Sequence, residues 1–210
     1  MELTEKLQDI LKGYEYEIGN RKLLFFNTKD KIIKLKKDEP ELFSELFNRM
    51  CAQFGSPDYV DAYYGFIWQA DGKVITLNSI EENYNYTVTT VYVLRKIPLG
   101  RKMKYSEYSR IEETVKQVFS DNNVDYCPFA TLFGGRIVVF GTNDECQCML
   151  AIKKRYLEFY YSVKEPFGDA FRLIPRYVRK ENISLSDLST VKEALKNCFA
   201  AKKNSAFYLP

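Results

Sequence analysis

The residue types that most often carry out catalysis are sparse in this sequence of 210 residues. Histidine is absent, which removes the commonest general base near neutral pH and the commonest metal ligand. Serine or cysteine nucleophiles that depend on a histidine base are therefore excluded. Glycine patterns that bind phosphates or dinucleotides are missing as well. We expect a protein that is not an enzyme and has no cofactor, with tyrosine, lysine or carboxylate chemistry as the remaining catalytic alternative.

Two pairs of adjacent carboxylates are candidate ligands for a metal ion. They are Glu81-Glu82 and Asp144-Glu145, with Asp58, Asp61 and Asp125 as neighbours in the repeated pattern described below. A hard cation needs several oxygens that converge within one small cage. Adjacent carboxylates on a hairpin loop point apart, so we favour solvated loops over a metal site.

Aromatic residues are the first candidate for a binding surface. They gather on both sides of Ala70-Asp71-Gly72, a strong hairpin signal. Strand alternation places Tyr64, Phe66 and Trp68 on one face and Tyr63 and Ile67 on the other. Most of these rings belong to a core, but both faces carry tyrosines and helices can cover only one. We therefore expect a partner-binding surface, the predicted aromatic surface, made of Tyr63, Trp68, Glu81, Glu82, Tyr84, Tyr86 and Tyr92, with Glu81-Glu82 as its acidic loop.

Basic residues are the second candidate. Lysine and arginine concentrate in residues 21–37, 95–104 and 153–180, each block ahead of a predicted helix. Protection of sheet edges against aggregation is the simpler interpretation, and a docking face for an acidic protein or for phosphates is the alternative. If the repeated units pack in similar orientations, the basic side chains form one rim, the predicted basic rim: Lys36, Lys37, Arg95, Lys96, Arg101, Lys102, Arg172, Arg176 and Arg179.

A repeated helix positions these residues. Tyr105–Phe119 and Leu185–Phe199 match without a gap, and their apolar residues are spaced by three and four, as in an amphipathic helix. Pro40–Phe54 is a fainter third copy. Short strands joined by turns follow the helices, which predicts antiparallel meanders. The predicted fold is α+β, with internally repeated units of one helix and a three-strand meander, helices on one sheet face, and a closing C-terminal helix.

The predicted boundaries follow from this pattern. A first half, 1–104, contains a short unit (1–39) and a unit 40–104, and a second half, 105–210, contains the terminal helix 185–199; together they form one compact body. Strands are expected at Tyr14–Ile18, Lys22–Phe26, Lys31–Leu35, Asp61–Gln69, Lys73–Asn78, Asn85–Lys96, Cys146–Ile152 and Arg155–Val163. Gly19-Asn20 and Lys29-Asp30 are the expected turns in the first unit, and Asn78–Asn83 is an expected loop.

Composition narrows the location and the function class. No apolar run reaches the length of a membrane span, the N-terminus lacks a secretory signal, and five scattered cysteines favour reduced thiols in the cytoplasm. The layout of helix-plus-meander units resembles that of small intracellular inhibitors and immunity proteins, which implies a bacterial or phage antagonist. We expect a non-catalytic protein-binding module that occludes a macromolecular partner through its aromatic sheet face and charged edges. The alternative is a nucleic-acid-associated protein that uses the basic rim, although the pI of 8.4 is low for that class.

Overall fold

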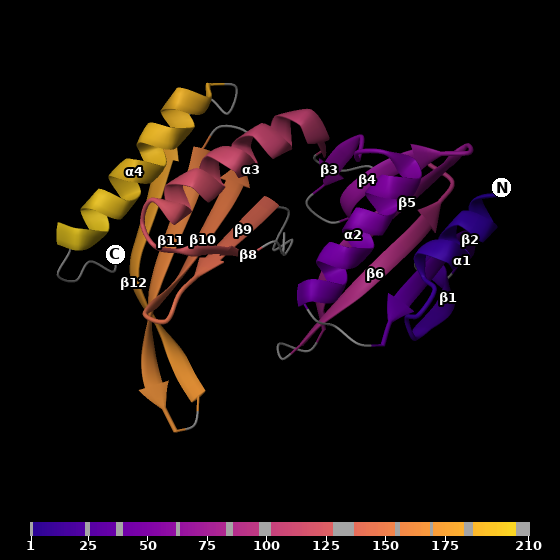
Figure 1. Ribbon diagram of the computed structural model, residues 1–210, viewed down its shortest axis with the longest axis horizontal. Coiled ribbons are helices and arrows are strands. Elements are labelled where there is room, and N and C mark those ends of the chain that lie inside the picture. The colour runs from indigo at the N-terminus through magenta and orange to yellow at the C-terminus, as the bar shows by residue number, and fades with distance from the viewer. Residues whose placement is uncertain are drawn as a thin grey trace. The chain divides into compact units, whose positions relative to one another are not determined.

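The computed structural model describes residues 2–23, 26–36, 40–61, 64–82, 86–96, 102–127, 137–153, 156–168, 170–182 and 187–204. Within them lie four α-helices and two antiparallel β-sheets (Figure 1). The described residues divide into two compact units, the first unit ending at Ser106 and the second unit beginning at Glu107. The α+β class, the antiparallel sheets and the C-terminal helix are confirmed, and the internal repeat stays a prediction.

The first unit has two helices and a seven-stranded sheet. The helices are α1 (Leu3–Ile10) and α2 (Pro40–Phe54). The strands lie in the order β1-β2-β6-β5-β4-β3-β7. Their bounds are β1 (Tyr16–Leu23), β2 (Phe26–Leu35), β3 (Tyr59–Asp61), β4 (Gly65–Ala70), β5 (Lys73–Glu82), β6 (Tyr86–Leu94) and β7 (Lys102–Lys104).

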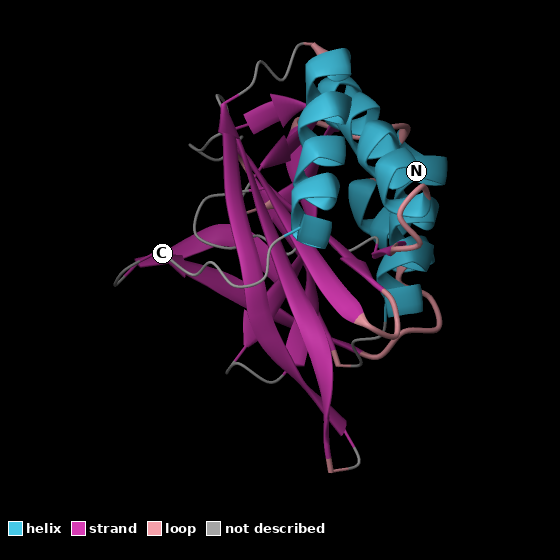
Figure 2. Ribbon diagram, turned by 90° about the vertical axis from the view of Figure 1, so that its left-hand side faces the viewer, coloured by secondary structure: helices cyan, strands magenta, loops and turns pink. Residues whose placement is uncertain are grey.

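The second unit has a five-stranded sheet in the order β12-β11-β10-β9-β8. Its helices are α3 (Tyr105–Ser120), whose first two residues belong to the first unit, and α4 (Leu188–Asn204). Its strands are β8 (Asp125–Cys127), β9 (Ile137–Thr142), β10 (Cys146–Lys153), β11 (Tyr156–Phe167) and β12 (Ala170–Asn182). In each unit the helices lie on one face of the sheet (Figure 2).

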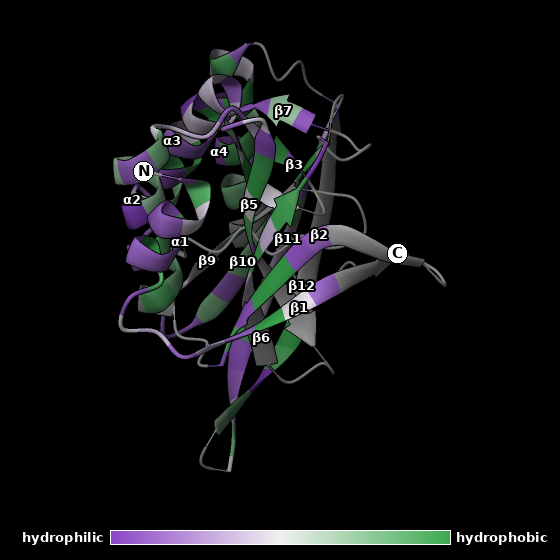
Figure 3. Ribbon diagram, turned by 90° about the vertical axis from the view of Figure 1, so that its right-hand side faces the viewer, coloured by the Kyte–Doolittle hydropathy of each residue, from purple (hydrophilic) through white to green (hydrophobic). Residues whose placement is uncertain are grey.

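The core of the first unit lies between α2 and the sheet. Leu46 and Met50 of α2 are fully buried, one turn apart, as the spacing of an amphipathic helix requires. The ring of Phe47 lies 4.7 Å from that of Phe66 on β4, measured between centroids. Hydrophilic and hydrophobic residues alternate along the helices, which is how one helix can face both the sheet and solvent (Figure 3).

Aromatic packing also holds the second unit together. The ring of Phe199 on α4 lies 5.9 Å from Phe119 on α3 and 5.0 Å from Phe159 on β11. Gly141 on β9 makes this close approach feasible, because a Cβ atom there would lie 2.5 Å from the Phe119 ring. The two helices therefore pack against the same face of the sheet.

The last helix begins three residues later than the predicted 185–199 segment. Asp187 caps it, because its Oδ1 accepts hydrogen bonds from the backbone N–H groups of Ser189 and Thr190 at 3.0 and 3.4 Å. Hydrogen bonds from the Ser189 and Thr190 side chains, the main cause, lower the pKa of Asp187 to about 2. The cap therefore stays charged throughout the neutral range.

Turn residues in the first hairpin were assigned wrongly from the sequence. Gly19-Asn20 lies inside β1, and Lys29-Asp30 lies inside β2, so the two turns predicted there are wrong. Gly19 pairs with Ile32 in a long antiparallel ladder whose register shifts between Asn20 and Lys22. Ladder hydrogen bonds and apolar cross-strand pairs override the local turn preference of a Gly-Asn pair.

The number of strands also differs from the pattern. In the described parts of the chain, two strands follow α1 and five follow each of α2 and α3, where the sequence predicts three after each helix. Three of the additional strands, β3, β7 and β8, have three residues each, which is too short to show two-residue alternation. Among the described residues, no helix has the length and the apolar composition needed to cross a bilayer.

Candidate functional site

Trp68, a member of the predicted aromatic surface, is a core residue. Its side chain is 1% exposed, and its ring lies 5.9 Å from Phe47 of α2. The indole N–H donates a 2.8 Å hydrogen bond to the carbonyl oxygen of Gly55, at the end of α2. Trp68 lies on the helix-covered face of β4, so its assignment to an exposed surface is wrong.

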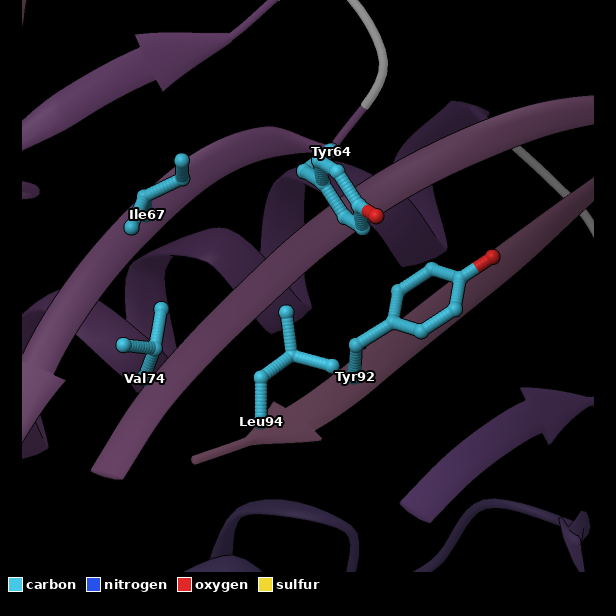
Figure 4. Packing of buried hydrophobic residues seen from close by; sticks show 5 residues of the cluster. All are labelled: Tyr64, Ile67, Val74, Tyr92 and Leu94. Carbon is cyan, nitrogen blue, oxygen red and sulfur yellow. The ribbon is translucent and has the colours of Figure 1, made fainter. Parts of the chain in front are cut away.

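Tyr92 is also buried, on the opposite face of the sheet. It belongs to an apolar cluster with Tyr64, Ile67, Val74 and Leu94, which lies on the side of the strands away from the helices (Figure 4). The rings of Tyr64 and Tyr92 meet edge to face with centroids 5.7 Å apart. Since a buried ring cannot contact a partner, the assignment of Tyr92 to the predicted aromatic surface is wrong.

The alternation predicted around Tyr64 is also wrong, and Gly65 is the reason. The backbone of Gly65 has φ +72°, so the strand begins only after Tyr64. The Tyr64 N–H donates a 3.0 Å hydrogen bond to Asp61 Oδ1, which holds the turn before the strand. Tyr64 therefore shares a face with Ile67 rather than with Phe66 and Trp68.

The structure describes only some of the remaining residues of the predicted aromatic surface. Glu81 and Glu82 lie in β5, paired with Thr87 and Tyr86 of β6, so the acidic loop predicted there is wrong. The strand extends because both sides of the hairpin continue to pair beyond Asn78. Tyr63 and Tyr84 lie outside the described residues.

The predicted basic rim is dispersed within the first unit. Arg95 and Lys96 are exposed at the end of β6, whereas Lys36 follows β2, which runs antiparallel to β6, so Lys36 lies at the other end of the sheet. Lys102 begins β7, which is four strand spacings from β6, about 19 Å. The prediction that these residues form one rim is therefore wrong for the first unit. In the second unit Arg172, Arg176 and Arg179 share β12, and Lys37 and Arg101 lie outside the described residues.

A cluster of titratable side chains joins α3 to β8 in the second unit. Glu112 Oε1 accepts hydrogen bonds from the hydroxyl groups of Tyr108, at 3.3 Å, and Tyr126. Lys116 lies 3.6 Å from Glu112 Oε2 and 4.6 Å from the centroid of the Tyr126 ring. Burial raises the pKa of Tyr126 far above its usual range, so this hydroxyl remains a hydrogen-bond donor and is unsuited to act as a base. The cluster links α3 to β8 through the hydrogen bond of Tyr126 and the contact of Lys116 with its ring.

This cluster predicts a loss of stability at alkaline pH. The pKa of Tyr126 is higher in the folded than in the unfolded chain, so its contribution is complete below pH 10 and declines as the pH rises. Each pH unit above that value should cost about 1.4 kcal/mol through this residue. Tyr126→Phe should therefore flatten the pH dependence of the urea midpoint. Midpoints at pH 8 provide the control for the substitution itself, and an unchanged alkaline slope would contradict the prediction.

A two-stranded arm extends from the second unit. Strand β10 pairs with β11 only as far as the Cys146–Val163 pair, whereas β11 and β12 continue to pair up to Phe167 and Ala170. Residues 164–168 and 170–174 therefore have a strand neighbour on one side only, and we call them the arm. It projects beyond the other strands of its sheet (Figure 1).

The arm exposes large apolar side chains on both faces. Phe167, Phe171 and Leu173 are 65%, 54% and 42% exposed. The register places Phe171 and Leu173 on one face and Phe167 on the other.

A cation accompanies each phenylalanine of the arm. Lys164 Nζ lies 4.8 Å from the centroid of Phe171, and Arg172 Cζ lies 5.9 Å from that of Phe167. Arg172 is also 3.2 Å from Glu165 Oε2. Exposed aromatic rings beside arginine are typical of protein interfaces.

The chain matches no family model, no curated protein and no solved structure. Its candidate site therefore depends on the geometry of the arm.

Sequence reasoning named Arg172 but missed the other residues of the arm, because it ended the strand at Val163. Pro166 and Pro175 are unfavourable within a ladder, since proline has no backbone N–H to donate. Both are tolerated here: β12 is an edge strand, and β11 is paired on one side only beyond Val163. The Phe-Gly step at Phe167-Gly168, with Gly168 at φ +61°, is the turn signal that could have revealed the arm.

Proposed function

We propose that the protein is a non-catalytic binding protein that contacts a protein partner through the arm. The exposure of Phe167, Phe171 and Leu173 on one short hairpin carries this proposal. Large apolar side chains that gather in contact with water on one projecting hairpin, here on both of its faces, mark a candidate interaction site on a folded domain. Aromatic rings and arginine are also the side chains that contribute most to protein interfaces.

The contacts within the arm favour a specific interface. Lys164 and Arg172 each lie over one of the two phenylalanine rings, and Glu165 forms an ion pair with Arg172, contacts that favour the observed side-chain positions. Side chains that are ordered before binding lose less conformational entropy when a partner docks. The arm is therefore prepared to insert into a groove of a folded partner. The helix-plus-meander layout favours one specific form of this function, an antagonist that occludes an enzyme by inserting the arm.

A cytoplasmic location accompanies this proposal. Cys51, Cys146, Cys148 and Cys198 form no disulfide within the part of the chain that the structure describes. Burial raises the pKa of Cys51, which keeps it protonated and unreactive. Thiols of this kind persist in a reducing compartment.

Nucleic acid is the second candidate partner. A two-stranded ribbon fits the major groove, and the arm carries Lys164 and Arg172. Glu165 partly neutralises this charge through its ion pair with Arg172, which favours a protein partner.

A photocrosslinking experiment tests the proposal. The full chain would carry p-benzoylphenylalanine at Phe171, and in a control protein at Lys12, which is exposed but lies in the first unit. In cells that naturally produce the chain, we expect one protein adduct from position 171 and none from position 12. Nuclease-sensitive adducts would favour nucleic acid, and equal labelling from both positions, or none, would contradict the proposal.

Substitution of the arm gives an independent test. Phe167→Ser combined with Phe171→Ser should abolish co-purification of the crosslinked partner. The thermal midpoint should not fall, because both rings are exposed in the folded chain. Retained binding by the double variant would contradict the proposal.

A further inference from the structure

A cavity of about 560 Å³ lies in the first unit, between α1 and the strands beneath it. Its walls come from α1, β1, β2 and β6 and from the turn between β4 and β5. This volume is within the range of sites that bind small molecules in proteins. It is separate from the arm, which belongs to the other unit.

Apolar side chains line one end of the cavity. Leu7 and Leu11 of α1 face Ile18 of β1 and Ile33 of β2 across it. Ile18 and Ile33 are direct cross-strand neighbours, and Ile18 is 61% exposed. An apolar ligand that covered Ile18 would remove this surface from water, which is favourable.

Three cations line the other end. Lys31 pairs with Val93 across β2 and β6, Lys73 begins β5, and Arg95 follows β6 two residues after Val93. The side-chain alternation that points Val93 toward the cavity also directs these three residues to the helix side of the sheet. Like charges that line one cavity repel one another, and an anion among them would relieve this repulsion.

The acidic residues of the cavity already have partners. Asp71 forms an ion pair with Lys6 at 3.1 Å, and the carboxylate of Glu2 caps the first turn of α1. Asp30, next to the cavity, accepts the backbone N–H of Arg95 at 3.1 Å. By contrast, Lys31, Lys73 and the guanidinium group of Arg95 form no ion pair with any described residue. The cationic end is thus complementary to an added negative charge.

The strand register gives the cavity a direction. Along β2, Lys31 precedes Ile33 and Leu35. On the antiparallel β1, the cross-strand neighbour of Ile33 is Ile18 and that of Leu35 is Tyr16. The charged end and the apolar end are therefore separated along the strands, by about 7 Å from Lys31 to the level of Ile33 and Ile18 and about 14 Å to the level of Tyr16. A ligand that fits this arrangement has a negative head and an extended apolar chain.

We propose that this cavity binds a single-chain amphipathic anion, with its head among Lys31, Lys73 and Arg95 and its alkyl chain against Leu7, Leu11 and Ile18. Alkyl carboxylates and alkyl phosphates share this chemistry. A carboxylate would be held bidentately by the Arg95 guanidinium, and both lysines would contribute as point charges. The inference does not depend on the function proposed for the arm.

Calorimetric titration of the full chain tests this inference. The ligands are decanoate, decyl phosphate and decanol, each below the concentration at which it aggregates. We expect both anions to bind with micromolar dissociation constants and decanol to bind about tenfold more weakly, because it lacks the charge. The tighter of the two anions identifies the head group, a carboxylate or a phosphate.

Substitutions separate the two ends of the cavity. Lys31→Glu combined with Lys73→Glu should weaken both anions by about tenfold or more and leave decanol unchanged. Ile18→Ser should weaken all three ligands. Lys12→Glu is the matched control, since Lys12 is exposed and does not line the cavity, and it should change nothing.

Three results would overturn the inference. They are the absence of binding by either anion at millimolar concentration, equal affinity for decanol and the anions, and undiminished anion binding by the Lys31→Glu/Lys73→Glu protein. All four substituted residues are exposed, so each variant should fold, and unchanged circular dichroism verifies this.

Discussion

Replacement of Trp68 by alanine should lower the free energy of unfolding of the first unit by about 3–5 kcal/mol. The side chain is 1% exposed, and its removal would leave a cavity beside Phe47 and Phe66. The carbonyl oxygen of Gly55 would also lose its 2.8 Å hydrogen bond from the indole. Both losses act at the contact between α2 and β4, on which the core of this unit depends.

Urea unfolding followed by far-ultraviolet circular dichroism measures this effect, since the variant has no tryptophan fluorescence. Phe171→Ala is the control: it removes another large aromatic ring, but an exposed one, and should change stability by less than about 0.5 kcal/mol. A surface role for Trp68 would reverse the order of the two variants. That outcome would reinstate Trp68 as a partner-binding residue.

Gly65→Ala should be similarly damaging, by about 3 kcal/mol or more when backbone strain and overpacking combine. A Cβ atom at this position would lie 2.2 Å from the carbonyl oxygen of Leu77, which is backbone and cannot move independently. The φ angle of +72° adds a conformational cost for any side chain. Displacement of β4 from β5 would also disturb Tyr64 and its contact with Tyr92.

Gly72→Ala provides a matched control for this substitution. Gly72 has a nearly identical φ of +69°, but a Cβ atom there would meet nothing within 4 Å. It should therefore show the backbone cost alone, about 1–2 kcal/mol. The difference between the two midpoints in urea isolates the clash with Leu77. Equal midpoints would mean that the strand moves without resistance and would contradict the prediction.

Local signals in the sequence predicted the helices well. Pro40–Phe54 matches α2, and the segment from Tyr105 forms α3, because apolar spacing and terminal residues both act over one or two turns. The hairpin at Ala70-Asp71-Gly72 is confirmed as well, with positive φ angles at Asp71 and Gly72. Such features depend on neighbours in the chain and can be recognised without knowledge of the fold.

Burial of the aromatic residues could not be predicted in the same way. Trp68 and Tyr92 alternate in their strands as surface residues could, and only the three-dimensional structure shows that side chains on both faces of the sheet centre are buried. A single glycine, Gly65, shifted the alternation and moved Tyr64 to the other face. Side-chain direction in a strand therefore depends on where the strand begins, to within one residue.

The candidate site escaped prediction for a related reason. Lys164 and Phe171 meet only because β12 returns beside β11, and the contact joins residues on two different strands. The prolines at 166 and 175 argued against a strand that the edge position permits. The cations of the cavity escaped prediction too: Lys31 and Arg95 were seen only as members of basic blocks and Lys73 belongs to no block, since the three come from β2, the end of β6 and β5.

The arm has a consequence for how this protein can change over time. Its tip contributes no side chain to the packed aromatic centre formed by Phe119, Phe159 and Phe199. Mutations between Glu165 and Leu173 can therefore accumulate while the scaffold stays intact. On the binding role proposed for the arm, natural variants that differ there would direct the molecule to another partner by exchanging a few residues, much as an antibody loop does on a constant framework.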